Sequence, residues 1–491
     1  MQTVTFANLW IDGRWRADVA LEIDGSGSVT RILPDSATAR GSAAYVPGLT
    51  LPGLADAHCH AFQRLLPAWT QRARASSEDF WSWREAMYTA AAQIDAEDLE
   101  AIAARCYLDL LRGGYTGVAE FLYLHRLTRA DDAVRGTPAP EGTAPDADAA
   151  IARAAALTGI RLTLLPALYQ HGNFGRVAPS AGQARFIRST DQFLRDWREL
   201  ARRYPPDGDT RLGVAFHSLR AVDVDTIAHV TAQLAGARGC AVTHIHVAEQ
   251  PAEVAACRKH YGSTPVALLA ERGLLDPQWA LVHGIHTTAA ELERIAASGA
   301  TLVLCPTTEA DLGDGCADAA HFLDAGGRLA IGSDSNIGCN AWAELRQLEW
   351  ALRLLRQRRN VLAGKSQPAV ADRLYRAVLA AGWHAVGRAA PLAPAAGQGV
   401  AGDAMRDLGR ADFVTFDSSE GDWPQLPPEY FLSALVFGAA APAARHVMVG
   451  GRWVIRDGRH AQQAQIDARY RAALERLKLP LRTALNDSIV G

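Results

Sequence analysis

Along the central part of the chain, short apolar segments alternate with longer segments in which apolar residues recur at helical spacing. Segments such as TPVALLAERGLL and TAAELERIAASG have the helical pattern. Eight segments are typical of buried strands: LPGLADAH, GYTGVAEFLYL, GIRLTLLPAL, RLGVAFHSL, AVTHIHVAE, WALVHGI, ATLVLCP and RLAIGSD. Regular alternation of strand and helix implies parallel strands joined by crossover helices. Eight such units favour a closed (β/α)8 barrel of the α/β class over an open sheet.

The two ends of the chain instead show short β segments separated by turn residues. Asp-Gly or Gly-Gly pairs interrupt WIDGRW and VALEIDGSGSVTRIL near the start, and RHVMVGGRWVIRDGRH near the end. We therefore predict a small β-sandwich domain from residues 1–49 and 396–465, a catalytic barrel over 50–395, and a C-terminal helix or tail over 466–491. The Pro-, Ala- and Asp-rich segment 128–150 is expected to be a solvated loop.

Composition is that of an ordinary globular protein, with 49% hydrophobic and 21% charged residues among 491. The net charge of −3 gives no reason to expect a nucleic-acid or membrane partner. Seven scattered cysteines argue against a disulfide framework, and Cys59, Cys106 and Cys305 are interpreted as small buried residues. The first residues lack the pattern of a signal peptide, and no segment is long and apolar enough to span a bilayer, so a cytoplasmic location is expected.

Side chains that can bind a metal ion stand where several of the predicted strands end. They are His58 and His60, His244, His246 and Glu249, His283 and His286, and Asp334. Active sites of such barrels lie at the C-terminal ends of the strands, so these groups are expected to converge. Side chains alternate faces along a strand, which puts His58 and His60 on one face. Three imidazoles and one carboxylate suit a catalytic zinc ion that keeps a position for water.

Each of these residues also has a structural interpretation. We prefer His246 to His244 as the ligand because it lies nearer the strand end and three residues before Glu249. His244 is then a packed or hydrogen-bonded core residue, and His286 is expected at the surface. Asp334 could instead cap a helix, because it stands in a run of capping residues, and Glu249 could be an exposed carboxylate in a first helical turn.

The motifs ADAHCH, HVAE, LVHG and GSDSN, in this order, resemble the amidohydrolase superfamily and, within it, the deaminase branch. The resemblance covers nearly the whole chain, including the split β domain. Members with two metal ions bridge them with a carboxylated lysine on a middle strand. The only lysines here, Lys259, Lys365 and Lys478, lie elsewhere. The resemblance therefore implies one metal ion per chain, expected to be Zn²⁺, although His and Asp ligands also accept Fe²⁺ or Mn²⁺.

A finer similarity is to the formimidoylglutamate deiminases of histidine degradation. It is carried by HCHAFQR (58–64), DFWSWREAMY (79–88), AEFLYLH (119–125), HSLRAV (217–222), HVAEQPAEV (246–254) and GSDSNIGCNAWAELR (332–346), and it weakens after residue 125. The resemblance implies a homodimer. It also implies metal ligands at His58, His60, His246 and Asp334, acid–base residues at Glu249 and His283 together with Asp334, and substrate contacts at Gln63, Arg84, Tyr123, His217 and Arg220.

Such a substrate carries two carboxylates and an amidine-like group, so its site needs fixed cations. Arg84 and Arg220 could each hold a carboxylate bidentately, and Tyr123 could add a donor. From the sequence alone, both arginines could equally lie on the surface. The main alternative is a related deaminase that acts on a nucleobase, a pterin or another ring amine. A ring-opening amidase and a binding protein with a structural metal are further alternatives.

Overall fold

The computed structural model describes every residue except 35, 37–43, 73–77, 128–145, 207, 238–239, 393–407, 420–424, 439–442 and 488–491. Its centre is a parallel eight-stranded sheet in the order β12-β11-β10-β9-β8-β7-β6-β5. The strands are β5 (Leu54–Cys59), β6 (Tyr115–Leu122), β7 (Arg161–Leu168), β8 (Thr210–Ser218), β9 (Cys240–Val247), β10 (Trp279–His283), β11 (Thr301–Leu304) and β12 (Arg328–Ile331). Each of the eight predicted strands is confirmed.

The sheet closes into a barrel at the C-terminal ends of its first and last strands. Cys59 at the end of β5 forms a parallel bridge with Asp334, just beyond β12. The Asp334 N–H donates to the carbonyl of His58 at 2.9 Å, and the His60 N–H donates to the carbonyl of Asp334 at 3.0 Å. The predicted barrel is therefore confirmed, and the contact that closes it lies at His58 and His60.

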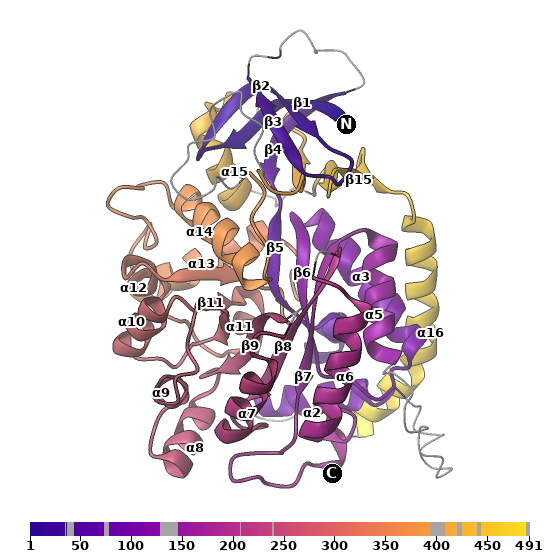
Figure 1. Cartoon of the computed structure of the whole chain (residues 1–491), viewed down its shortest axis with the longest axis vertical. Coiled ribbons are helices and arrows are strands. Elements are labelled where there is room, and N and C mark those ends of the chain that lie inside the picture. Colours follow the sequence, from indigo (N-terminus) through magenta and orange to yellow (C-terminus); the bar gives the residue numbers. More distant parts are fainter. Residues whose placement is uncertain are drawn as a thin grey trace.

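Helices follow the strands and cover the barrel (Figure 1). α10 (Ala289–Ser298) shows why the sequence gives helices here: Thr288 and Glu291 form a capping box, and Gly299 ends the helix at φ 75°. The others are α1 (Pro67–Thr70), α2 (Phe80–Ala91), α3 (Ala96–Arg112), α5 (Asp146–Thr158), α6 (Thr190–Arg203), α7 (Val224–Leu234), α8 (Pro251–Tyr261), α9 (Pro265–Glu271), α11 (Pro306–Leu312), α12 (Ala319–Asp324), α13 (Ala341–Arg356), α14 (Val370–Ala385), α15 (Phe431–Phe437) and α16 (Gln463–Asp487). Short 3-10 helices are η2 (Ala61–Leu65), η3 (Ala181–Gln183) and η5 (Pro428–Tyr430).

Two segments differ from the prediction. Residues 146–150, expected in a loop, form the first turns of α5, whose alanine-rich sequence has high helix propensity and packs on α3. The rest of that predicted loop, 128–145, lies outside the described residues. The C-terminal helix α16 begins before residue 466 and runs along α3, where Arg105 contacts Asp467 at 2.7 Å (Figure 1). The described part of the tail is therefore docked on the barrel.

The two chain ends form a second, mixed eight-stranded sheet, drawn at the top of Figure 1. Its strands are β1 (Gln2–Ile11), β2 (Arg14–Ile23), β3 (Val29–Leu33), β4 (Tyr45–Pro52), β13 (Phe413–Phe416), β14 (His446–Val449), β15 (Arg452–Arg456) and β16 (Arg459–His460). The Asp12-Gly13 turn has φ values of 52° and 74°, as a two-residue hairpin requires. Buried apolar side chains of both chain ends pack into one core beside this sheet, and the backbone next to β3 forms an antiparallel bridge from Ser28 to Arg410.

Among the described helices, none combines the length and the apolar composition that crossing a membrane requires. The homodimer that the resemblance implies and the cytoplasmic location stay predictions.

Candidate active site

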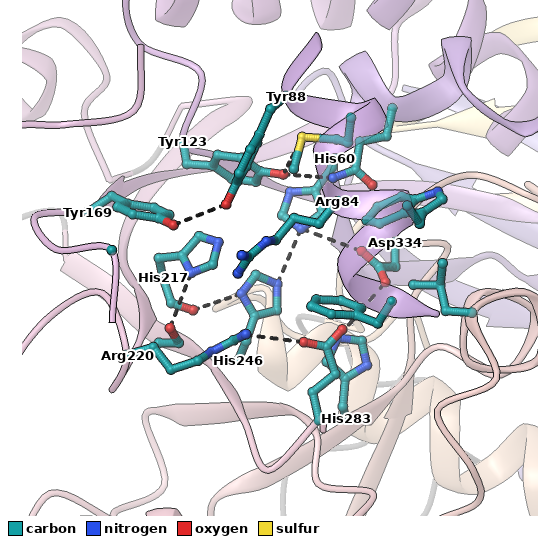
Figure 2. A pocket seen from close by; sticks show the side chains of 18 residues that line it. His60, Arg84, Tyr88, Tyr123, Tyr169, His217, Arg220, His246, His283 and Asp334 are labelled. Atoms are coloured by element: carbon teal, nitrogen blue, oxygen red, sulfur yellow. Dashed lines mark hydrogen bonds and ion pairs between the residues drawn. The ribbon is translucent and has the colours of Figure 1, made fainter. Parts of the chain in front are cut away.

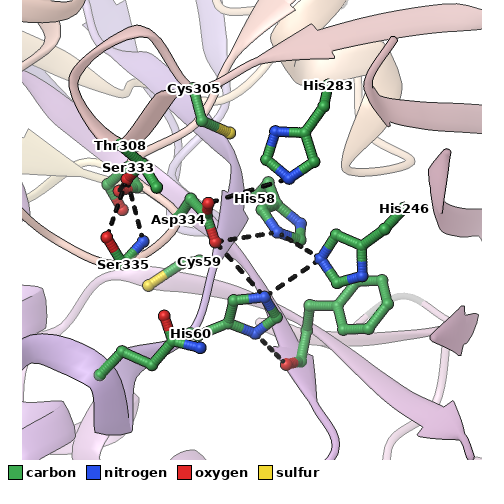
Figure 3. A network of polar contacts seen from close by, with 12 residues as sticks. His58, Cys59, His60, His246, His283, Cys305, Thr308, Ser333, Asp334 and Ser335 are labelled. Atoms are coloured by element: carbon green, nitrogen blue, oxygen red, sulfur yellow. Dashed lines mark hydrogen bonds and ion pairs between the residues drawn. The ribbon is translucent and has the colours of Figure 1, made fainter. Parts of the chain in front are cut away.

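Three imidazoles and one carboxylate meet at the C-terminal mouth of the barrel (Figure 3). His58 and His60 come from the end of β5, His246 from β9, and Asp334 from the loop after β12. Nε2 of His246 lies 3.1 Å from Nε2 of His58 and 3.2 Å from Nε2 of His60. Oδ1 of Asp334 lies 3.4 Å from Nε2 of both His58 and His60. The predicted ligand set is therefore brought together in one place.

The protonation of these rings fits a bound cation. Nδ1 of His60 lies 2.8 Å from the carbonyl of Phe121, and Nδ1 of His246 lies 2.8 Å from the carbonyl of His217. Because a carbonyl only accepts, each Nδ1 carries the hydrogen, and each Nε2 presents a lone pair. Burial lowers the pKa of His58, His60 and His246, which keeps the rings neutral. Lone pairs at these separations repel each other unless a metal ion lies between them, and the donors are those that zinc prefers.

The backbone around Asp334 is fixed by buried polar groups. Asp334 adopts φ 47°, a left-handed conformation that is strained for a residue with a side chain. The Asn336 amide donates to the carbonyls of Asp334 at 3.0 Å and His60 at 2.9 Å. Asp56 accepts from the Ser333 hydroxyl at 2.6 Å. No helix starts at Asp334, since α13 begins only at Ala341, and the capping interpretation is wrong.

His283, at the end of β10, is surrounded by carboxylates. Its Nε2 lies 3.6 Å from Oε1 of Glu249 and 3.9 Å from Oδ2 of Asp334. Its Nδ1 lies 3.3 Å from Oε1 of Glu309. Burial lowers the pKa of His283, but Glu249, Glu309 and Asp334 together raise it to about 10. This ring can therefore hold or move a proton beside His58, His60, His246 and Asp334, the group of predicted ligands that we call the metal cluster.

Glu249 lies in the loop between β9 and α8 and is 5% exposed, so the interpretation as an exposed helix carboxylate is wrong. Its backbone N–H donates to Oε2 of Glu253 at 3.0 Å, which holds the loop in place. Burial raises the pKa of Glu249, although His283 and Arg220 oppose that rise. A buried carboxyl with a raised pKa can carry a proton at neutral pH and donate it.

The other histidines, cysteines and lysines named from the sequence do not join the four ligands. His244 is buried outside the cluster, with Nε2 2.8 Å from the carbonyl of Ala385, as predicted for a core residue. His286 was expected at the surface, but it is half-buried, because its backbone N–H donates to Ala248 and ties its loop to the barrel. Cys59, Cys106 and Cys305 are free and buried, as predicted, and all three lysines are exposed, whereas the four ligands are buried.

The five predicted substrate contacts line one cavity beside the metal cluster (Figure 2); they are Gln63, Arg84, Tyr123, His217 and Arg220. The Gln63 amide donates to the Tyr123 hydroxyl at 2.7 Å. Arg220 is 7% exposed, and its Nη2 lies 3.4 Å from Oε2 of Glu249. Arg84 extends from α2 into the cavity, with its guanidinium 4.5 Å from the ring centre of Trp81. Arg220 is therefore buried, and Arg84 is half-buried with its side chain in the cavity.

Sequence reasoning missed three residues of this site. Tyr88 stands four residues after Arg84 on α2, so helical spacing could have placed both on one face. Tyr169 directly follows the last residue of β7, which is the position that site residues occupy in a barrel. Glu309 lies in α11, one turn after β11, and Oε1 accepts from the Cys305 backbone at 2.8 Å. No histidine stands at the end of β11, so the sequence did not predict a site residue after that strand.

Comparison with known proteins agrees with this geometry. Residues 49–391 match the amidohydrolase family. The chain is 40% identical over 448 residues to a formimidoylglutamate deiminase from Pseudomonas aeruginosa, covering 91% of this chain and 93% of that protein. It is 28% identical over 417 residues to a 5-methylthioadenosine/S-adenosylhomocysteine deaminase from Halobacterium salinarum, covering 83% and 82%. A crystal structure of an amidohydrolase from Brucella melitensis superposes with a TM-score of 0.83 at 34% identity, covering 97% of this chain and 100% of that one. Because the family match spans well over half of the sequence, the chain belongs to the amidohydrolase family.

Proposed function

We propose that this protein is a metal-dependent deiminase that hydrolyses N-formimino-L-glutamate to N-formyl-L-glutamate and ammonia, a reaction of histidine degradation. The observation that carries the proposal is that two guanidinium groups, Arg84 and Arg220, line the cavity that also holds the metal cluster. A dicarboxylate needs such groups, whereas a nucleobase would need amide and aromatic groups matched to a ring edge. The relative at 40% identity supports the same substrate.

We further propose that one Zn²⁺ ion is held by His58, His60, His246 and Asp334. When bound, such an ion lowers the pKa of water and so supplies hydroxide at neutral pH. The exposed positions of the lysines support a single ion, because no lysine side chain reaches the cluster to bridge a second one. The ligand set itself does not select zinc over iron or manganese, so metal analysis of the purified protein is the test of this point.

In the proposed reaction, the side chains around the cluster move two protons. Oδ2 of Asp334 receives the proton that the attacking water releases, and His283, whose Nε2 lies 3.9 Å from Oδ2 and whose raised pKa keeps the ring protonated, donates to the attacking oxygen. The oxygen adds to the formimino carbon and gives a tetrahedral centre. Asp334 passes the first water proton to the imino nitrogen, which becomes an amino group, and Glu249 donates the second proton to it. The C–N bond then breaks, ammonia leaves, and the hydroxyl proton of the tetrahedral centre returns to the Glu249 carboxylate as the carbonyl of the formyl product forms. Arg220, beside Glu249, holds a substrate carboxylate at this end of the cavity.

Glu309 is expected to position His283 for this role. Replacing Glu309 with glutamine should lower kcat about 10–100-fold with little change in KM, because a partner that orients a catalytic group without touching substrate affects mainly turnover. The carboxylate fixes Nδ1 of His283 as the hydrogen-bearing nitrogen, so Nε2 faces Glu249 and Asp334. Steady-state kinetics on the metal-loaded variant would test this, and an unchanged kcat would contradict it.

The proposed function is tested by ammonia release from the purified, zinc-loaded protein. N-formimino-L-glutamate is compared with guanine, adenine, cytosine and N-carbamoyl amino acids at equal concentration. We expect fast release from N-formimino-L-glutamate alone, with N-formyl-L-glutamate as the second product. Release from a ring amine alone would agree with the proposed metal chemistry but would contradict the assignment of Arg84 and Arg220 to substrate carboxylates.

A further inference from the structure

Two tyrosine hydroxyl groups on the cavity wall have no role in the reaction described above. Tyr88 comes from α2 and Tyr169 from the loop after β7, and both side chains are buried. Their hydroxyl oxygens lie 3.5 Å apart at the cavity (Figure 2). Arg84 stands one helical turn before Tyr88, and its guanidinium carbon lies 5.5 Å from the centre of the Tyr88 ring. Two hydroxyls and a guanidinium thus share one side of the cavity.

The direction of the hydroxyl hydrogens follows from Gln183, a buried residue of η3. Oε1 of Gln183 accepts from the Ser180 backbone N–H at 2.8 Å, which fixes the orientation of the amide. Its Nε2 therefore faces the tyrosines and donates to the Tyr169 hydroxyl at 2.6 Å and to the Tyr88 hydroxyl at 3.3 Å. Each phenol oxygen already accepts a hydrogen bond, so its own hydrogen points elsewhere.

At most one of the two hydroxyl hydrogens can be donated to the other tyrosine, and the oxygen–oxygen distance of 3.5 Å makes that hydrogen bond long. At least one O–H is therefore free to donate into the cavity. Burial raises the pKa of Tyr169, which keeps the hydroxyl protonated and a donor. Together with Arg84, this wall offers only hydrogen-bond donors, which is what a carboxylate requires.

We propose that Tyr88, Tyr169 and Arg84 bind the distal carboxylate of the substrate, and that Gln183 positions the two hydroxyls. The inference rests on the proposed function and extends it to the residues that select a dicarboxylate. Arg220 contacts Glu249 at the reacting end and also interacts with Tyr169 and Tyr88, so it lies between the two ends of the cavity; we assign to it the α-carboxylate next to the amidine. The distal carboxylate is two methylene groups further away and reaches the side of the cavity that the tyrosines share with Arg84.

The test compares two substrates in four variants: Tyr88→Phe, Tyr169→Phe, the double variant, and Gln183→Glu. One substrate is N-formimino-L-glutamate. The other is N-formimino-L-2-aminobutyrate, which keeps the α-carboxylate and lacks the distal one. We expect each phenylalanine to raise KM for the dicarboxylate about tenfold, because a hydrogen bond to a charged group is lost. The kcat for the dicarboxylate, and kcat/KM for the aminobutyrate, should stay near the values of the unmodified protein.

Gln183→Glu gives a second route to the same result with both hydroxyls in place. A carboxylate at this position accepts from the phenols and turns their hydrogens away from the cavity, so the preference for the dicarboxylate should fall as in the phenylalanine variants. Tyr375→Phe is the matched control, because it removes a buried hydroxyl that donates to the carbonyl of Pro52 at 2.6 Å, outside the cavity.

Three outcomes would overturn the proposal. The preference for the dicarboxylate over the aminobutyrate could persist in the folded phenylalanine variants, or it could persist in Gln183→Glu. Alternatively, both substrates could lose kcat/KM equally, which would indicate a structural role for the tyrosines. Failure of the proposed function looks different: the unmodified protein would then release no ammonia from N-formimino-L-glutamate. The distal-carboxylate assignment would fall with it.

Discussion

Replacing Glu249 with glutamine is expected to lower turnover of the metal-loaded protein by about 10²–10⁴-fold, the usual contribution of a positioned acid or base. Glutamine keeps the size and polarity of the side chain but has no proton to give to the departing nitrogen. Because Glu249 is not one of the four proposed ligands, the metal content should be unchanged. Elemental analysis and ammonia release on the same sample test both parts of this expectation.

A matched control for Glu249→Gln is Glu344→Gln. Glu344 is also fully buried, and burial raises the pKa of its carboxyl to about 8, but it accepts from Thr307 and does not line the cavity. We expect Glu344→Gln to keep turnover and to affect mainly the free energy of unfolding. Near-normal turnover in metal-replete Glu249→Gln, or an equal loss in both variants, would contradict the proton-donor role.

The fold was accessible from the sequence because its signals are local. Each barrel strand is a short apolar run bounded by turn residues, and each such run lies where it was predicted. The start of α5 was not predicted, because its first residues, 146–150, have the same Ala- and Asp-rich composition as the preceding segment. Alanine is common in loops of biased composition and is also the best helix former, so composition alone could not place the boundary.

The metal cluster was accessible for a related reason: barrel topology brings strand ends together however far apart they are in sequence. What topology does not give is the direction of a side chain within a loop. His286 follows a strand yet turns aside, since Gly284 (φ 58°) redirects the backbone after β10. Glu309 and Tyr169 carry no motif of their own, and their roles depend on distances that only the folded chain defines.

His244 and His246 offer the sharpest test of the metal cluster, because they are two residues apart on the same buried strand. His246→Gln should leave the purified protein with little metal and no turnover above background. Losing a partner that only orients a ligand already costs about 10–100-fold in metal affinity, and losing a ligand should cost more. His244→Gln should keep metal and turnover and lower the free energy of unfolding by about 1–3 kcal/mol, because the contact with Ala385 is disturbed.

The two variants make the same substitution in the same strand, so damage to the barrel core should be similar in both. A difference in metal content between them can then come only from which side chain lies at the cluster, because both point to the same face of β9. Elemental analysis after gel filtration, thermal unfolding with and without added Zn²⁺, and ammonia release would be measured in parallel. If His244→Gln lost the metal and His246→Gln kept it, the ligand assignment on β9 would be wrong. Equal loss of metal in both variants would also contradict the assignment, because metal retention would then follow the packing of β9 and not the side chain of His246.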